Sequence, residues 1–196
     1  IEFDPQFTKD GKIVIWHDKD LARLTRGQDL RLVSEITDQE FAALRFGSGR
    51  STNLEELLGM HERYPEAIYA IHLKSHLQEP HYLDALLDQL NCVSSSDSFF
   101  IFDVRIPAAE YIKKKNKDIK LAPSVVHPHD KKRFNQATGG TLIAMDEAIS
   151  NKKLFDWMWL DEWDRVGESG DKSLYNADNF KILRNKPSPL LKKTLD

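Results

Sequence analysis

The chain has 196 residues, with 28 basic against 31 acidic side chains and a formal net charge of −3. A length of this order suits a single domain, residues 1–196, that buries roughly 70% of its unfolded surface. The near balance of charge argues against a nucleic-acid-binding protein, the single Cys92 excludes an internal disulfide, and no apolar run approaches the roughly 18 residues of an integral membrane segment.

The first predicted element is a strand at Ile1–Asp4 that carries two acids. Side chains alternate across a strand, so Glu2 and Asp4 share one face. Two neighbouring carboxylates in a partly buried place repel each other unless a cation compensates them. A divalent ion such as Mg²⁺ or Ca²⁺ would do so, because these ions prefer oxygen ligands. An exposed strand end paired with lysines is the alternative.

A tight turn and a second short strand follow. The segment Lys9–Lys12 contains Asp-Gly, a pair typical of hairpin turns, and the apolar run Ile13–Trp16 comes next. Such a hairpin turns the chain back towards its start, so we expect it to bring His17 towards the two acids.

Apolar strands alternate with helical repeats along the rest of the chain, which is the order of a parallel α/β fold. Leucine spacing predicts helices over residues 54–61 and 83–90, the first with a capping box of Thr52 and Glu55, and a third helix begins at Pro107. The predicted strands are Ile1–Asp4, Ile68–Lys74, Phe99–Asp103, Ile119–Ala122, Thr141–Met145, Trp157–Leu160 and Phe180–Leu183. One more strand upstream would make eight, which predicts a (β/α)₈ TIM barrel lacking its first strand in this sequence.

Polar side chains follow several of these strands, at the end where barrel enzymes carry their active sites. They are Lys74, Asp103, Asp146 and Asp161. We interpret Asp146 as a cap of the next helix. Lys74 could stabilise negative charge on a metal-bound phosphate.

Two further features could lie at the mouth of the barrel. Trp159 could pack on a glycerol or sugar moiety of a substrate, with a plain core position as the alternative. His127 and His129 form an H-x-H pair that could bind a metal, but the proline between them favours a loop at the rim of the site.

Several motifs occupy the first 60 residues in a fixed order. They are E-x-D at Glu2–Asp4, T-x-D-G at Thr8–Gly11, H-D at His17–Asp18, L-x-R-x-T-x-G at Leu21–Gly27, I-T at Ile36–Thr37 and S-T-N-L-E-E-L-L at Ser51–Leu58. Together they resemble the glycerophosphodiester phosphodiesterase family. The resemblance implies a metal-dependent hydrolase that splits a glycerophosphodiester into glycerol 3-phosphate and an alcohol.

By this resemblance Glu2 and Asp4 are ligands of Mg²⁺ or Ca²⁺, and His17 is a catalytic acid or base. The family's third ligand is a Glu in a strand ending in E-x-K, and the matching residue here is His72. The family's His-Arg motif, at the end of the first barrel strand, does not occur in this chain. We therefore expect sequence ahead of Ile1.

The same resemblance gives Lys74 a catalytic and substrate-binding role beside the phosphate. From its place at a strand end, Asp103 is a predicted substrate-binding residue; it could also bond to a metal ligand, act as a ligand that compensates for His72, or simply cap the next helix. Trp159 would contact substrate. The expected partner is a small-molecule phosphodiester.

Two other functions stay open. His72 and the missing first motif fit a barrel that binds phosphate esters but is catalytically impaired. A phosphodiesterase or lyase acting on a different phosphodiester is the second, although the disulfide-rich spider-venom sphingomyelinase D-like lyases are a poor match for a chain with one cysteine. The lack of a signal-like start favours the cytoplasm, with a lost N-terminal signal as the alternative.

Overall fold

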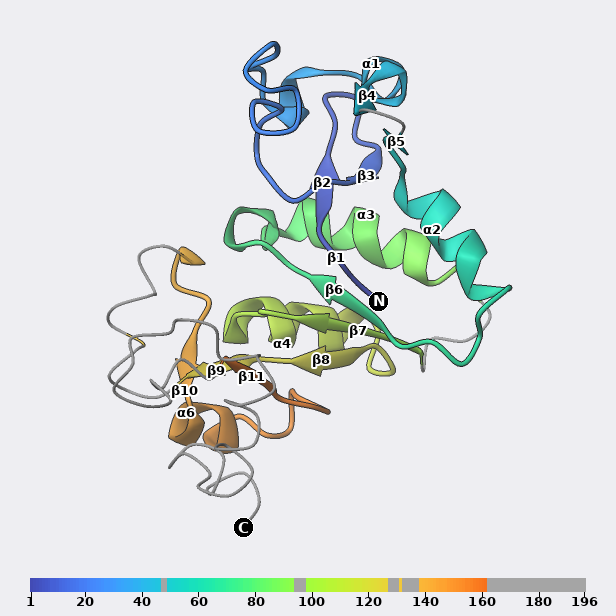
Figure 1. Cartoon of the computed structure of the whole chain (residues 1–196). Coiled ribbons are helices and arrows are strands. Elements are labelled where there is room, and N and C mark those ends of the chain that lie inside the picture. Colours follow the sequence, from blue (N-terminus) through green and yellow to red (C-terminus); the bar gives the residue numbers. More distant parts are fainter. Residues whose placement is uncertain (47–48, 94–97, 127–130, 132–137, 162–196) are drawn as a thin grey trace, which may run out of the picture.

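A four-stranded parallel sheet forms the centre of the computed structural model, which describes residues 1–46, 49–93, 98–126, 131 and 138–161. Its strands, in spatial order, are β1 (Glu2–Phe3), β6 (Tyr69–His72), β7 (Phe99–Phe102) and β8 (Lys120–Ala122). The crossovers between them include η2 (Ser75–Leu77), α3 (Pro80–Leu90) and α4 (Ile106–Lys115) (Figure 1). The predicted alternation of parallel strands and helices is therefore confirmed.

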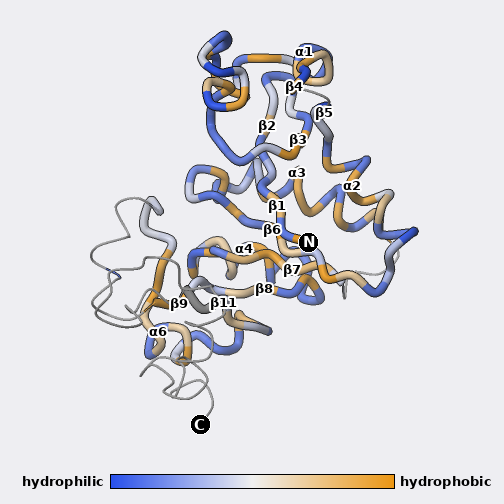
Figure 2. Tube along the Cα trace, in the orientation of Figure 1, coloured by the Kyte–Doolittle hydropathy of each residue, from blue (hydrophilic) through white to orange (hydrophobic). Residues whose placement is uncertain are grey.

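The main core lies between this sheet and its helices. Ile71 and Ile101 are fully buried on the sheet, and they belong to one cluster with Leu83, Leu86 and Ile112 of the helices. The hydropathy colouring shows β7 as an apolar strand (Figure 2). Because one face of each strand packs on helices, the alternate side chains of β1 and β6 point to the opposite face, where the candidate site lies.

A second parallel sheet continues from the first. Its central strand is β9 (Ser124–Val126), which pairs with β10 (Ile143–Ala144) and with β11 (Trp159–Asp161), and α6 (Met145–Ser150) lies between the last two in sequence. The predicted end of the strand at Ala122 is confirmed, since β8 ends there, whereas the separate strand β9 beyond Pro123 was not predicted. The predicted strand Phe180–Leu183 and the pair His127 and His129 lie outside the described residues.

A hairpin and a small second core follow β1 in the chain and lie at the top of Figure 1. The strands β2 (Pro5–Phe7) and β3 (Ile13–Ile15) are antiparallel, and Gly11 takes the positive φ of 77° that the predicted turn requires. The core contains Trp16 and Phe41 and includes residues of η1 (Val33–Glu35), α1 (Asp38–Ala43) and β4 (Arg45–Phe46), and β4 pairs with the exposed strand β5 (Gly49–Arg50). The Trp16 N–H donates to the Asp4 carbonyl at 2.8 Å, which ties this hairpin to β1.

The helix α2 (Leu54–His61) begins as predicted, but its cap differs from the prediction. The Asn53 side chain accepts the Glu56 N–H at 2.9 Å, so Asn53 is the cap. The predicted capping box of Thr52 and Glu55 is wrong, because the Thr52 hydroxyl donates to the Glu56 carboxylate at 2.7 Å. Asp146 is also not a cap, because it lies in the first turn of α6 and the cap position is Ala144.

Replacing the cap of α2 gives a direct test of this local structure. Asn53→Ala is expected to lower the free energy of unfolding by about 1 kcal/mol, because the Glu56 N–H loses its acceptor. Asn53→Ser retains a capping oxygen and should stay within a few tenths of a kcal/mol of wild type. Urea unfolding of both variants checks this, and equal losses would show that the cap bond contributes nothing.

No helix within the described residues is both long enough and apolar enough to cross a membrane.

Candidate metal and phosphate site

Three candidate ligand residues meet at the carboxyl ends of β1 and β6. Glu2, Asp4 and His72 each offer one oxygen or nitrogen atom, and these atoms all lie within 4.8 Å of one another. The arrangement follows from the parallel pairing of β1 with β6, which aligns Glu2 with Ala70 and so places the strand ends side by side. Asp4 is buried, whereas Glu2 is exposed to the cavity beside it.

Two basic side chains already contact the acids. The Lys74 ammonium lies 2.7 Å from Asp4 Oδ1, and His72 Nδ1 lies 2.8 Å from the same oxygen. Lys74 Nζ and His72 Nδ1 are themselves 3.2 Å apart. Asp4 therefore has two basic partners at one oxygen, as expected because a partly buried carboxylate needs compensating positive charge.

The protonation equilibria reflect this crowding. Burial, and then the nearby Asp4 charge, raise the pKa of Glu2. Burial also opposes ionisation of Asp4, but the hydrogen bonds from His72 and Lys74 outweigh it and lower the pKa of that carboxyl. Burial opposes protonation of His72 as well, yet its bonds to Asp103 and Asp4 raise the pKa of the imidazole to about 9. A site with these shifts attracts positive charge.

The donor set fits a divalent cation. Two carboxylates and an imidazole converge, with Glu2 offering an oxygen to the cavity, and this is the chemistry of a protein metal centre. The structure brings the three predicted ligand residues together. Their role as ligands stays a prediction.

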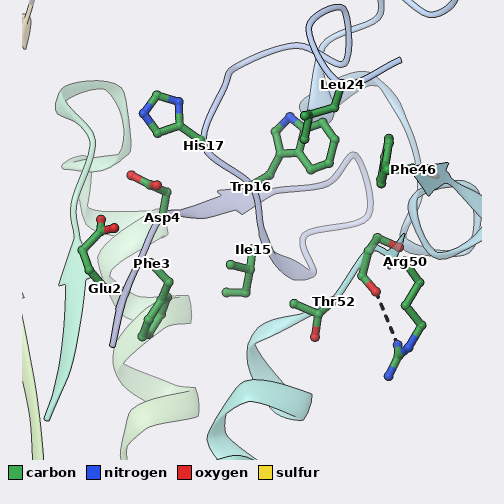
Figure 3. A pocket seen from close by; sticks show the side chains of 11 residues that line it. Glu2, Phe3, Asp4, Ile15, Trp16, His17, Leu24, Phe46, Arg50 and Thr52 are labelled. Atoms are coloured by element: carbon green, nitrogen blue, oxygen red, sulfur yellow. Dashed lines mark hydrogen bonds between the residues drawn. The ribbon is translucent and has the colours of Figure 1, made fainter. Parts of the chain in front are cut away.

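His17 lies at the same cavity, as the hairpin predicted (Figure 3). The cavity has a volume of about 330 Å³, and Glu2, Asp4 and His17 line it. The His17 side chain is 64% exposed, and its Nδ1 lies 2.7 Å from Asp18 Oδ1. Arg23 in turn donates to Asp18 Oδ2 at 2.6 Å. Asp18 therefore orients the ring through Nδ1.

Asp103 and Trp159 lie on the other side of Glu2, in a cavity of about 470 Å³. Asp103 Oδ2 is 3.4 Å from His72 Nε2. Trp159 stacks on Phe102 with ring centroids 4.1 Å apart, and Phe102 stacks on His72 at 4.7 Å. Trp159 packs on the buried Phe102 and also lines the cavity. Its contact with a substrate stays a prediction.

His76, for which no role was predicted, lies near Lys74 on one side and bonds to Gln6 on the other. Its Nε2 lies 3.2 Å from Oε1 of Gln6, a residue of β2 that is 4% exposed. Burial, together with the charges of Lys19 and Lys74, lowers the pKa of His76 to about 4. The H-x-K-x-H spacing of His72, Lys74 and His76 at the end of a strand is the feature of the sequence that could have indicated His76.

His76 predicts a pH dependence of stability. Its pKa in the folded protein, about 4, lies below the unfolded value of about 6.5, so the unfolded chain binds more protons between these values. The stabilisation is complete above pH 6.5 and is lost as the pH falls towards 4. We expect urea unfolding at pH 7 and pH 4.5 to show a smaller loss of unfolding free energy for His76→Gln than for wild type. His81→Gln, at an exposed position, is the control, and an equal loss in both variants would contradict the prediction.

The fold and the site together define a parallel α/β enzyme whose polar residues gather at the carboxyl ends of its strands. A family model described as "Glycerophosphoryl diester phosphodiesterase family" matches residues 1–137. The chain belongs to this family and is therefore a phosphoric diester hydrolase with the TIM-barrel fold, as predicted. No curated protein matches the chain.

Solved structures show the same fold. A glycerophosphodiester phosphodiesterase from Parabacteroides distasonis is 13% identical with a TM-score of 0.55, and the match covers 95% of this chain and 84% of that one. An Oleispira antarctica phosphodiesterase, solved in complex with the product sn-glycerol-3-phosphate, is 18% identical with a TM-score of 0.55, covering 82% and 80%. At these identities the similarity concerns the fold alone.

Proposed function

We propose that the protein hydrolyses glycerophosphodiesters to glycerol 3-phosphate and an alcohol, with a divalent metal ion held by Glu2, Asp4 and His72. The observation that carries this proposal is the convergence of those three side chains beside Lys74, at a cavity that His17 also lines. Membership of the family supports it, and so does the product bound to the Oleispira antarctica phosphodiesterase of the same fold.

The proposed chemistry divides between charge neutralisation and proton transfer. A divalent ion, when bound, supplies positive charge next to the phosphoryl oxygens. Lys74 contributes a second positive charge, and because its Nζ lies at the Asp4 carboxylate it is held where a phosphate oxygen would accept from it.

His17 is the proposed acid or base. Asp18 occupies its Nδ1, so Nε2 is the atom that gives a proton to the departing alkoxide or takes one from the attacking oxygen. Trp159 and Phe102 offer an apolar wall on which a glycerol moiety could pack. The phosphate of the substrate would then lie at the cation that Glu2 would help to hold, between the two cavities that Glu2 lines.

Chelation tests the metal in this proposal. The full-length protein is incubated with glycerophosphodiesters and a chelator, and Mg²⁺, Ca²⁺ and other divalent ions are then restored one at a time. We expect release of glycerol 3-phosphate to stop in the chelator and to return with at least one ion. Undiminished release in the chelator would remove the metal from the mechanism.

A barrel that binds phosphate esters without hydrolysing them is the second candidate. One observation favours it: both Lys74 and His72 already neutralise Asp4 Oδ1, so the acids have cationic partners within the protein. Calorimetric binding of glycerol 3-phosphate by a folded full-length protein, with no turnover under any metal, would support this candidate over the hydrolase.

A further inference from the structure

The imidazole ring of His72 is held in one orientation. Its face stacks on Phe102 with an interplanar angle of 13°, and Phe102 is itself backed by Trp159 at 17°. Within that plane, Nδ1 faces the acids, 2.8 Å from Asp4 Oδ1 and 3.9 Å from Glu2 Oε1. Nε2 faces the opposite way, towards Asp103.

Asp103 is placed by an unusual backbone conformation. Its φ is 65°, in the left-handed region that non-glycine residues seldom adopt, and its side chain is buried. Gln78 holds this conformation: its Nε2 donates to the carbonyls of Asp103 and Leu73 at 2.8 and 3.0 Å, and its Oε1 accepts the Arg105 N–H at 2.9 Å. The clamp joins the ends of β6 and β7 and directs the Asp103 carboxylate at His72. Backbone conformations of this kind persist where surrounding bonds impose them, and they cluster at functional sites.

We propose that Asp103 is a positioning residue that keeps the proton of His72 on Nε2, so that Nδ1 joins Glu2 and Asp4 as a metal ligand and gives the centre a preference for Co²⁺ or Zn²⁺ over Mg²⁺ and Ca²⁺. This inference rests on the proposed function, because it takes a metal at these residues as given. Beyond the proposed function, it specifies that the centre prefers Co²⁺ or Zn²⁺ and that Asp103, which is not itself a ligand, controls this preference.

The chemistry of the donors supports this selectivity. Mg²⁺ and Ca²⁺ favour oxygen ligands, whereas imidazole nitrogen suits transition-metal ions. A carboxylate that accepts the other N–H of a ligating histidine fixes its tautomer and raises its basicity, and loss of such a carboxylate typically weakens metal binding 10- to 100-fold. Asp103 stands in that relation to His72.

Titration calorimetry on the metal-stripped full-length protein tests the inference with Co²⁺, Zn²⁺, Mg²⁺ and Ca²⁺. Asp103→Asn should weaken Co²⁺ binding about 10- to 100-fold, whereas Asp88→Asn, at an exposed position on α3, should leave it unchanged. His72→Glu replaces nitrogen with oxygen, and should lower the ratio of Co²⁺ to Mg²⁺ affinity at least about ten-fold. Asp4→Ala should abolish binding of every ion.

A spectroscopic readout keeps the test decisive if Asp103→Asn does not fold. In pulsed EPR of the Mn²⁺-loaded protein we expect coupling to a directly bound nitrogen in wild type and none in His72→Glu. If Asp4→Ala abolishes binding but wild type lacks that coupling, or His72→Glu leaves the ion preference unchanged, the inference is overturned while the proposed metal site stands. If the wild-type protein binds no ion in a manner that depends on Asp4, the metal site itself is overturned, and this inference with it.

Discussion

Asp4→Asn is expected to lower kcat/KM for glycerophosphodiester hydrolysis by about 1,000-fold. The substitution keeps the shape of the side chain but removes the charge that Lys74 and His72 both contact. It thereby removes a proposed metal ligand and the group that holds Lys74 in place. Steady-state kinetics with saturating metal give the measurement.

Stability must be followed in the same variant, because two cationic side chains lose their shared partner. We expect the variant to remain folded at the assay temperature with a reduced free energy of unfolding, since breaking such a pair is costly in a partly buried place. Asp88→Asn is the matched control, and should retain wild-type kinetics. Activity of a folded Asp4→Asn protein within a few fold of wild type would contradict the assignment of Asp4.

His17→Gln carries the second large expected effect, a fall in kcat of about 100- to 10,000-fold. Glutamine can occupy the position and hydrogen-bond to Asp18, but it cannot exchange a proton near neutral pH. Because His17 is exposed and is not among the candidate metal ligands, metal affinity and thermal stability should be unchanged. Rate measurements are paired with metal titration on the same preparation.

Two comparisons sharpen this test. His81→Gln removes an exposed histidine from α3, outside both cavities, and should leave kcat unchanged. Asp18→Asn weakens the orientation of His17 and the bond from Arg23 but leaves the imidazole in place, so its loss of kcat should be smaller than that of His17→Gln. If His17→Gln retains wild-type kcat, the catalytic proton transfer belongs to another group.

Much of the site could be predicted because it depends on local patterns. Alternation along a strand puts Glu2 and Asp4 on one face, and the hairpin at Gly11 brings His17 to their cavity. The rule that barrel sites gather at strand ends pointed to Lys74 and Asp103, and in the structure Lys74 contacts Asp4 and Asp103 contacts His72.

What could not be predicted depends on contacts between distant residues. The left-handed backbone of Asp103 follows from the Gln78 clamp across two strand ends, and no spacing in the sequence encodes it. The stack of His72, Phe102 and Trp159 requires β11 to pair with β9, whereas a sequential barrel order would place β11 beside β10.

The most direct test of the central claim is ³¹P NMR of glycerophosphocholine incubated with the metal-loaded full-length protein, with Asp4→Asn in parallel. We expect the phosphodiester resonance to be replaced by that of glycerol 3-phosphate in the wild-type sample and to persist in the variant. An unchanged spectrum from folded wild-type protein, phosphocholine as the product, or equal conversion by Asp4→Asn would contradict it.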